Sequence, residues 1–522
     1  MTPATLRLAR HLGFLYGEAD ERVIAQAAAT IQALAAGSVC CEVTDDETRL
    51  ALTVSPMVAT DPAARDRPLT LDGPRVYLTR YWAEQSAIVD WLTTRLPGGA
   101  TGAETATTAA RLAAAYPFCV IAGGPGTGKT TAVAGILAGL VTDRPLRVIL
   151  TAPTGRAAAR LEQAVREQLA DSPRRALIRV ESGTLHRILG LKPWGEADHD
   201  AGHPLPADVI IVDEASMLSL HLMALLLRAI TPPTRLVLVG DPDQLASVDA
   251  GAVLADIASS DATIPVHRLT HTYRFRGDIA RLADAIRRGD ADQALAVLGA
   301  PAAEVQWLDS ESADAAGPAL QDEIVEQGLA LIDAGRAGDA ARALATLDSH
   351  RLLLAHRHGL AGVSHWTQTV RGWLAGPAGS YTLGAHWYAG MPVLITRNDD
   401  LLGVYNGDAG VIVQTAEGLA LAVGDGPGVK YIPPDMLQAW EPLYASTIHK
   451  AQGSQYDAVT LVLPPPDTVM ATRELLYTAV TRAKTRLRVI GSEAALRHAI
   501  ASPALRASGL AAKLGELPRL LR

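Results

Sequence analysis

The segment GGPGTGKT, residues 123–130, constrains the fold of this chain more than any other feature. It follows an apolar run and precedes a helical pattern, which is the context of a phosphate-binding loop. Its glycines let backbone N–H groups curl around phosphate oxygens, and the next helix adds the positive end of its dipole. Lys129 is expected to reach the β- and γ-phosphates of ATP, and Thr130 to ligate Mg²⁺. The alternative is a glycine-rich turn that holds no ligand. The expected phosphate-binding residues are Gly123, Gly124, Pro125, Gly126, Thr127, Gly128, Lys129, Thr130 and Thr131.

Four short apolar runs predict a parallel β-sheet around this loop. They are FCVIAGG (118–124), RVILTAPT (147–154), DVIIVDEAS (208–216) and RLVLVGDPDQ (235–244), separated by helical or loop sequence. Buried runs that alternate with helices are typical of α/β folds. Such sheets bind ligands at the carboxyl ends of their strands, where each run has its polar residues.

Three side chains at strand ends are candidates for the chemistry of ATP hydrolysis. Asp213 and Glu214 follow the third run, where one carboxylate can hold Mg²⁺ and the other can accept the proton of the attacking water. Gln244 follows the fourth run, where its amide can contact both the γ-phosphate and that water. Without the neighbouring motifs, Asp213 and Glu214 would be interpreted as a solvated strand end and Gln244 as a glutamine in a turn.

Phosphoryl transfer also needs cations that balance the charge building on the γ-phosphate. Arg274 in LTHTYRF and Arg482 in YTAVTRAK are the candidates. Both lie in a second α/β unit that begins near Leu269, so each could reach ATP only across a cleft between units. A lone arginine is otherwise a surface or salt-bridge residue.

Three segments are candidates for nucleic-acid contact. They are TAPTGRAAARL (151–161), GTLHRILG (183–190) and YASTIHKAQGSQYD (444–457), and each places hydroxyl, histidine or basic groups at a strand end or helix start. Such groups bind phosphates with little regard to base sequence. Each segment could equally be helix-capping chemistry. The candidate DNA-binding residues are Pro153, Thr154, Arg156, Thr184, His186, Thr447, His449 and Lys450.

The rest of the chain suggests further divisions. Residues 1–98 are expected to form a helical N-terminal domain that docks a partner, and residues 99–265 the first α/β domain. Within the latter, about 191–207 read as an exposed hairpin; a metal site at His199 and His203 is the weaker alternative. Residues 266–385 and 441–522 are expected to form the second α/β domain. Short alternating strands at 386–440 indicate an inserted antiparallel barrel.

Composition excludes several classes of protein. A chain of 522 residues is too long for one core, and 48% hydrophobic with 20% charged residues is ordinary for a globular protein. The net charge of -8 requires any DNA contact to be a local groove. The cysteines Cys40, Cys41 and Cys119 suit neither a metal site nor a disulfide framework, which indicates a reduced, cytoplasmic protein. No apolar run is long enough to span a bilayer, so no association with a membrane is expected.

The ordered motifs resemble those of superfamily-one helicases. The motifs are GGPGTGKTT, TAPTGRAAARL, TLHRILG, VIIVDEASML, LVGDPDQLASVDAG, LTHTYRF, YASTIHKAQGS and RELLYTAVTRAK. Two further pieces, PLTLDGPRVYLTRYW and MPVLITRNDDLLGVYNGDAGVIV, are similar to the RecD family, the alpha chains of RecBCD exonuclease V complexes.

That resemblance implies a fold and a function. The implied fold has two RecA-like motor domains, a pin hairpin in the first and an SH3-like β-barrel in the second. The implied activity is ATP- and Mg²⁺-dependent 5′-to-3′ movement on single-stranded DNA, within a complex that acts at duplex ends and double-strand breaks. The implied partners are RecB, which carries the nuclease, and RecC. One departure is that residues 105–113, TATTAARLA, lack the glutamine by which such helicases read adenine, which leaves adenine selectivity in doubt.

Two other functions fit parts of the pattern. A stand-alone RecD-like helicase would work without RecB and RecC, but such relatives usually carry a longer N-terminal extension. A nucleotide-switched scaffold would hydrolyse ATP feebly and hold a DNA-processing complex together. The complete set of Lys129, Glu214, Gln244 and the two arginines argues against the scaffold.

Overall fold

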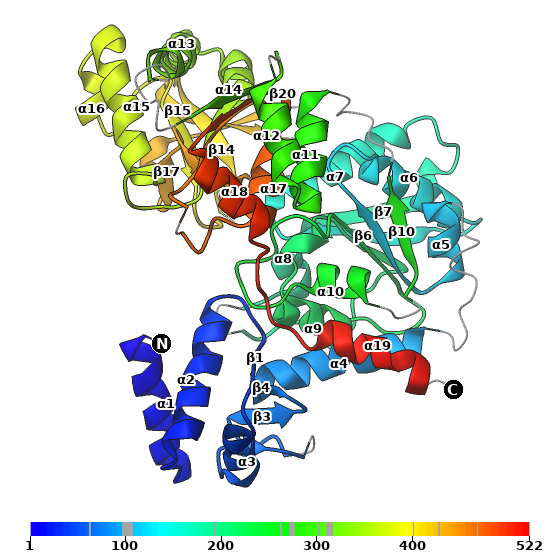
Figure 1. The fold of residues 1–522 in the computed structure, drawn as a ribbon. Coiled ribbons are helices and arrows are strands. Elements are labelled where there is room, and N and C mark those ends of the chain that lie inside the picture. The colour runs from blue at the N-terminus through cyan, green and yellow to red at the C-terminus, as the bar shows by residue number, and fades with distance from the viewer. Residues whose placement is uncertain are drawn as a thin grey trace.

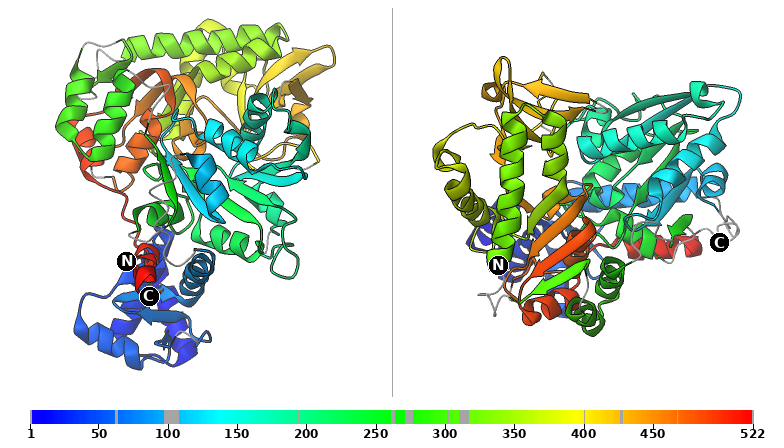
Figure 2. Two further views of the ribbon diagram at one scale, coloured as in Figure 1. Left: turned by 90° about the vertical axis from the view of Figure 1, so that its right-hand side faces the viewer. Right: turned by 90° about the horizontal axis from the view of Figure 1, so that it is seen from above.

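The computed structural model describes residues 2–61, 64–96, 108–192, 195–260, 264–270, 277–300, 303–309, 317–399, 401–425, 428–466 and 468–520. Two α/β units lie next to each other, and a smaller N-terminal unit projects from the first of them (Figures 1 and 2). Throughout these ranges, every helix is too short or too polar to cross a bilayer.

The N-terminal unit contains a sheet as well as helices, so the expected helical domain was only part of it. Its sheet has the order β1-β4-β3-β2, in which β4 pairs antiparallel with both of its neighbours and β2 pairs parallel with β3. The two-residue turn Gly73-Pro74 joins β3 to β4, and Gly73 has φ 57°, a conformation that favours glycine. The elements are α1 (Pro3–Tyr16), α2 (Glu21–Ala35), β1 (Cys40–Glu42), α3 (Asp46–Val54), β2 (Val58–Ala59), β3 (Leu69–Asp72) and β4 (Arg75–Leu78).

Helix α4 (Thr79–Arg95) joins the N-terminal unit to the first α/β unit. Its buried residues Trp82, Ile88 and Leu92 share one hydrophobic core with α9 of the first unit. The boundary expected at residue 98 therefore divides residues that pack together, because the apolar face of α4 is buried against the neighbouring unit.

The first α/β unit is built on a six-stranded parallel sheet of order β10-β5-β9-β8-β6-β7. Strand β10 pairs with β5, the strand that leads into the phosphate-binding loop, so the sheet extends beyond the boundary expected at residue 265. The strands are β5 (Phe118–Gly123), β6 (Leu146–Ala152), β7 (Ile178–Thr184), β8 (Val209–Val212), β9 (Arg235–Gly240) and β10 (Val266–Leu269). The helices are α5 (Ala109–Ala115), α6 (Lys129–Leu140), α7 (Gly155–Gln168), α8 (Leu185–Leu189), α9 (Leu220–Arg228) and α10 (Val253–Ser259), with 3₁₀ turns η2 (Arg175–Leu177) and η3 (Ala215–Met217).

The second α/β unit has a five-stranded parallel sheet of order β11-β20-β19-β12-β18. Its strands are β11 (Val305–Leu308), β12 (His350–Leu354), β18 (Ser446–Thr447), β19 (Tyr456–Val462) and β20 (Ala483–Ile490). Its helices are α11 (Asp278–Arg288), α12 (Ala291–Gly299), α13 (Gly317–Arg336), α14 (Ala340–Ser349), α15 (Val363–Ala378), α16 (Tyr381–Gly384), α17 (Arg473–Val480) and α18 (Glu493–Ala501), with the 3₁₀ turn η6 (His449–Ala451).

A five-stranded antiparallel sheet is inserted into this second unit, in the order β16-β15-β14-β13-β17. Leu331 of α13 and Ala343 of α14 pack with Val411 and Val413 of β14, which fixes the insertion to its host unit. Strands β16 and β17 form the two edges of the sheet. The elements are β13 (Pro392–Ile395), β14 (Ala409–Thr415), β15 (Gly418–Asp425), β16 (Gly428–Ile432), the 3₁₀ turn η5 (Pro434–Met436) and β17 (Trp440–Pro442).

The C-terminal segment leaves the second unit and returns to the N-terminal unit, although residues 441–522 were expected to stay with the second domain. The backbone N–H of Val39 donates to the Ala507 carbonyl at 2.7 Å, and Gly509 N–H donates to Gln85 Oε1 at 3.2 Å. Helix α19 (Leu510–Leu520) then buries Leu510 and Leu514 beside α4 and α10 (Figure 1).

The segment expected to be a hairpin, residues 191–207, forms no strand among its described residues, which exclude Pro193 and Trp194. Local turns hold it instead: Lys192 N–H donates to Glu196 O at 2.7 Å, and Asp200 N–H to His203 O at 3.2 Å. Pro204 and Pro206 lack the N–H donor that a regular ladder needs. The segment is therefore an exposed loop.

Candidate nucleotide site and nucleic-acid surface

The phosphate-binding loop connects β5 to α6 in a conformation that only its glycines adopt easily. Gly126 and Gly128 have φ of 76° and 86°, and Thr127 Oγ1 donates to the Gly124 carbonyl at 2.8 Å. The Lys129 ammonium donates to the Gly123 and Gly124 carbonyls at 2.9 and 3.3 Å. Lys129 therefore lies against the loop that a nucleotide would occupy, and its amine can turn from these carbonyls to phosphate oxygens.

A cavity of about 420 Å³ lies over this loop between the two α/β units. It brings together residues from both units, because the strand ends of the two sheets face the same cleft. Of the predicted residues, Pro125, Gly126, Gly128, Lys129, Thr130, Thr131, Asp213, Glu214, Gln244 and Arg482 line it.

Asp213 and Glu214 follow β8 at the edge of this cavity. The pKa of Asp213 is raised to about 6, chiefly by desolvation and also by the negative charge of Glu214, while the positive charge of Lys129 lowers it. Glu214 has φ 49°, and throughout the described ranges it is the only non-glycine residue with positive φ. Such strain is characteristic of functional positions. Two adjacent carboxylates in this setting fit a bound Mg²⁺, which Asp213 and the Thr130 hydroxyl would hold.

Gln244 and Arg482 meet across the cleft. The buried Arg482 guanidinium donates Nη2–H to Gln244 Oε1 at 3.0 Å, and its other nitrogens donate to the carbonyls of Ser454 and Thr478. Arg482 is therefore already held at the cavity wall, opposite the phosphate-binding loop. The second predicted arginine, Arg274, lies outside the described residues, as do residues 105–107 of the segment that lacks glutamine.

Arg160 and Gln455 also line the cavity, and the sequence reasoning did not identify them. Arg160 lies on α7 and donates to the Gly453 carbonyl of the second unit at 3.4 Å. It follows Arg156 by one helical turn, so the two share a helix face. That spacing within TAPTGRAAARL was a signal that could have suggested Arg160.

The candidate DNA-binding residues lie at strand ends of both units. Thr154 caps α7 and Thr184 caps α8, so these two hydroxyls have the capping role that was the alternative interpretation. The Thr447 hydroxyl accepts from Lys450 N–H. Pro153 precedes α7, and His186 and His449 lie in α8 and η6. Capping leaves a hydroxyl oxygen at a helix start, where anions also bind.

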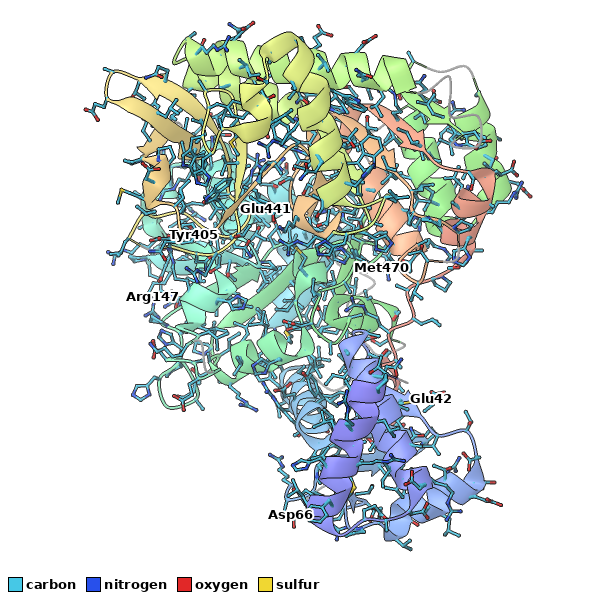
Figure 3. The ribbon with its side chains drawn as sticks, turned by 90° about the vertical axis from the view of Figure 1, so that its left-hand side faces the viewer. Glu42, Asp66, Arg147, Tyr405, Glu441 and Met470 are labelled. Carbon is cyan, nitrogen blue, oxygen red and sulfur yellow. The ribbon has the colours of Figure 1, made fainter. Side chains whose placement is uncertain are left out.

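The two candidate DNA-binding cations are both paired with carboxylates of the second unit. Arg156 Nη2 lies 3.2 Å from Asp348, at the end of α14. The Lys450 ammonium contacts Glu441 of β17, which also pairs with Arg357 at 2.9 Å. Glu441 and Tyr405 lie where the insertion meets the first unit (Figure 3), and the Tyr405 hydroxyl accepts from Arg187 at 3.5 Å. The insertion thus borders the predicted DNA surface.

A metal site at the 191–207 loop finds no support. His199 Nδ1 contacts the His203 carbonyl at 3.0 Å, and no metal-binding cluster of three or more His, Cys, Asp or Glu side chains occurs in the part of the chain that the structure describes.

Two family models match parts of the chain. An AAA domain model matches residues 102–307, and a UvrD-like helicase C-terminal domain model matches residues 442–490. The chain is 43% identical to the RecBCD enzyme subunit RecD of Mycolicibacterium smegmatis, over 98% of this chain and 97% of that protein.

More distant relatives match less of the chain. The ATP-dependent RecD2 DNA helicase of Deinococcus radiodurans is 33% identical over 74% of this chain and 49% of its own length. A solved structure of Bacteroides Pif1 bound to ssDNA has a TM-score of 0.40 at 15% identity, covering 78% of this chain and 91% of that one, which is too low to establish a shared fold.

Proposed function

The chain belongs to the family of RecD subunits of RecBCD enzymes, and on that premise we propose a 5′-to-3′ translocase on single-stranded DNA. It is an ATP-dependent DNA helicase, and we propose that it hydrolyses ATP as the Mg²⁺ complex. The proposed substrates are single-stranded DNA and duplex ends at double-strand breaks, and the proposed partners are RecB and RecC subunits.

The contact between Arg482 and Gln244 across the cleft is the observation that supports a motor best. Hydrolysis needs a cation at the γ-phosphate, and here that cation belongs to the unit opposite the phosphate-binding loop. ATP would therefore hold the two units together, and its hydrolysis would release them. Because candidate DNA-binding residues lie on both units, closing and opening the cleft would move one set of contacts relative to the other.

Within the site, each residue has a proposed role. Lys129 binds the β- and γ-phosphates, Asp213 and Thr130 hold Mg²⁺, and Glu214 accepts the proton of the attacking water. Gln244 senses the γ-phosphate, and Arg482 balances its developing charge. Mg²⁺ supplies charge neutralisation at the phosphates when it is bound.

The N-terminal unit is the proposed docking surface for the partner subunits. Helix α1 exposes Leu8, Phe14 and Leu15 by 49%, 82% and 60%, and α3 exposes Leu50 and Val54 by 68% and 78%. Apolar side chains this exposed on a small unit are typical of protein–protein interfaces. None of them is in the nucleotide cavity, which suits a role in assembly.

ATPase and unwinding assays test the proposal. ATP hydrolysis should rise strongly with single-stranded DNA, and unwinding should require a 5′ single-stranded tail on the duplex.

Lys129→Gln and Glu214→Gln should each lower the hydrolysis rate by roughly two to four orders of magnitude, whereas Glu214→Gln should still bind ATP. Glu417→Gln, in the exposed turn after β14, is the matched control. Equal rates with and without DNA, or near-normal turnover by Glu214→Gln, would contradict the proposal.

The stand-alone helicase is the less favoured alternative. The chain spans nearly the full length of the M. smegmatis subunit but about half of the D. radiodurans RecD2 helicase. Co-purification from cell extract distinguishes the two, since a subunit should bring RecB and RecC with it.

A further inference from the structure

Tyr477 of the second unit reaches across the cleft to the phosphate-binding loop. It lies on α17, five residues before Arg482, and is 6% exposed. Its hydroxyl donates to Asp241 Oδ2 at 3.1 Å. The same hydroxyl lies 3.1 Å from where a Cβ on Gly124 would be, so it touches the first turn of the loop.

Asp241, the residue after β9, is the centre of this contact. It is 2% exposed and accepts three hydrogen bonds: from Tyr477, from Gln244 Nε2 at 3.0 Å and from Asp243 N–H at 3.1 Å. Burial raises the pKa of Asp241, and the Lys129 charge lowers it. A buried carboxylate depends on such donors, because each lost donor leaves charge without compensation.

The contacts form a closed chain of side chains between the two units. Tyr477 binds Asp241, Asp241 binds the Gln244 amide, and Gln244 Oε1 accepts from Arg482. Arg482 is in turn tied to α17, because its Nε–H donates to the Thr478 carbonyl at 3.0 Å. The donor to Asp241 and the donor to Gln244 therefore come from one short stretch of the second unit.

The loop borders two cavities. One is the nucleotide cavity, and the other, of about 280 Å³, is lined by Tyr477, Asp241 and Gly124, none of which lines the first. Burial and the neighbouring Asp241 carboxylate raise the pKa of Tyr477, so its hydroxyl stays protonated and can only donate to that carboxylate. The hydroxyl thus contacts the loop at Gly124, outside the lining of the nucleotide cavity.

We propose that Tyr477 is a positioning residue for ATP hydrolysis, which anchors Asp241 and thereby orients the Gln244 amide between Arg482 and the γ-phosphate. This inference rests on the proposed ATPase function of the same site. Tyr477 does not line the nucleotide cavity. It acts by fixing the amide of Gln244, whose Nε2 is held by Asp241 and whose Oε1 is held by Arg482, and by seating the second unit against the loop.

A double-mutant cycle on the full-length protein tests the proposal. Tyr477→Phe removes only the hydroxyl, and kcat with saturating single-stranded DNA should fall about tenfold, since one donor to a buried carboxylate is lost. KM for ATP should change less than about twofold, because Tyr477 does not line the nucleotide cavity. Asp241→Asn should give a similar loss, and the double variant should lose little more than either single variant.

A second readout separates positioning from a general loss of stability. In Tyr477→Phe the acidic limb of the kcat profile should move to higher pH, because the Asp241 carboxylate has lost a donor. Tyr116→Phe, which removes a buried tyrosine hydroxyl in the first unit, is the matched control and should show neither change.

Several results would overturn the inference. One is a double variant whose kcat falls by the product of the two single effects. Another is an effect of Tyr477→Phe on KM for ATP alone. A third is a Tyr477→Phe variant with normal kcat and an unchanged pH profile. If single-stranded DNA does not stimulate ATP hydrolysis by the wild-type protein, the proposed function is refuted independently of the role of Tyr477. The cycle can then still be measured on the basal rate, which shows separately whether Tyr477 and Asp241 act together.

Discussion

Removing the carboxylates that pair with the candidate DNA-binding cations should strengthen the binding of single-stranded DNA. Asp348→Asn frees Arg156 and Glu441→Gln frees Lys450, and each replacement keeps the shape of the side chain. The pairs are partly exposed: side-chain exposure is 35% and 45% for Arg156 and Asp348, and 29% and 22% for Lys450 and Glu441. We expect DNA phosphates to displace both carboxylates in the wild-type protein.

The size of the effect follows from that exposure. Partly exposed ion pairs contribute about 1 kcal/mol or less, so each replacement should raise DNA affinity by up to about fivefold. The two sites share no partner residue, so the double variant should approach the product of the single effects, up to about 25-fold. Arg357 also contacts Glu441, and its release could add a further phosphate contact.

Fluorescence anisotropy with a labelled oligothymidine at several salt concentrations measures both the affinity and its salt dependence. The slope of log K against log salt should stay unchanged, because Arg156 and Lys450 neutralise phosphates in the wild-type complex too. Asp435→Asn, on an exposed turn of the insertion, is the control. Unchanged affinity would refute the reasoning. A slope steeper by roughly 0.7 per cation would show that the pairs persist in the wild-type complex.

Three further predictions concern other parts of the molecule. Asp213→Asn should raise the free energy of unfolding of the nucleotide-free protein by on the order of 2 kcal/mol at pH 8, which thermal unfolding measures. The same variant should no longer bind Mg-ATP. The wild-type carboxyl, whose pKa is raised to about 6, favours folding while it is protonated, and this contribution to stability is lost as the pH rises through 6. The variant should therefore be no more stable than the wild-type protein at pH 4. Replacing residues 192–206 by a short Gly/Ser turn should spare ATPase with single-stranded DNA and greatly reduce unwinding; a matching loss of both would mean that the loop supports the fold. Phe14→Ser with Leu15→Ser should weaken pull-down of RecB and RecC while ATPase stays normal, and intact assembly would remove α1 from the interface.

The nucleotide cavity could be predicted because its chemistry is local in sequence. Lys129, Asp213 and Gln244 each follow an apolar strand, and parallel strands place their carboxyl ends at one edge of the sheet. Arg482 could be predicted only from the motif around it, because no local sequence pattern shows that the second α/β unit packs against the first.

Other features could not be predicted from local patterns, or their signals were overlooked. The Asp72-Gly73 pair between two apolar runs was a hairpin signal, and it marks the sheet of the N-terminal unit. By contrast, strands such as Val58–Ala59 are too short to show a period. The contact of Tyr477 with Asp241 depends on how two units dock, which residue spacing does not encode.

The path of the C-terminal segment has a consequence for the order in which the protein can be made. Leu510 and Leu514 complete a core whose other residues include Tyr77, Trp82 and Ile88. A ribosome releases those partners hundreds of residues apart, so the junction beneath the first α/β unit cannot close until residues 510–514 have been translated. Until then, the part of α4 that α19 covers stays accessible to chaperones, and a chain cut anywhere between Ser502 and Ser508 would lose the helix that covers it.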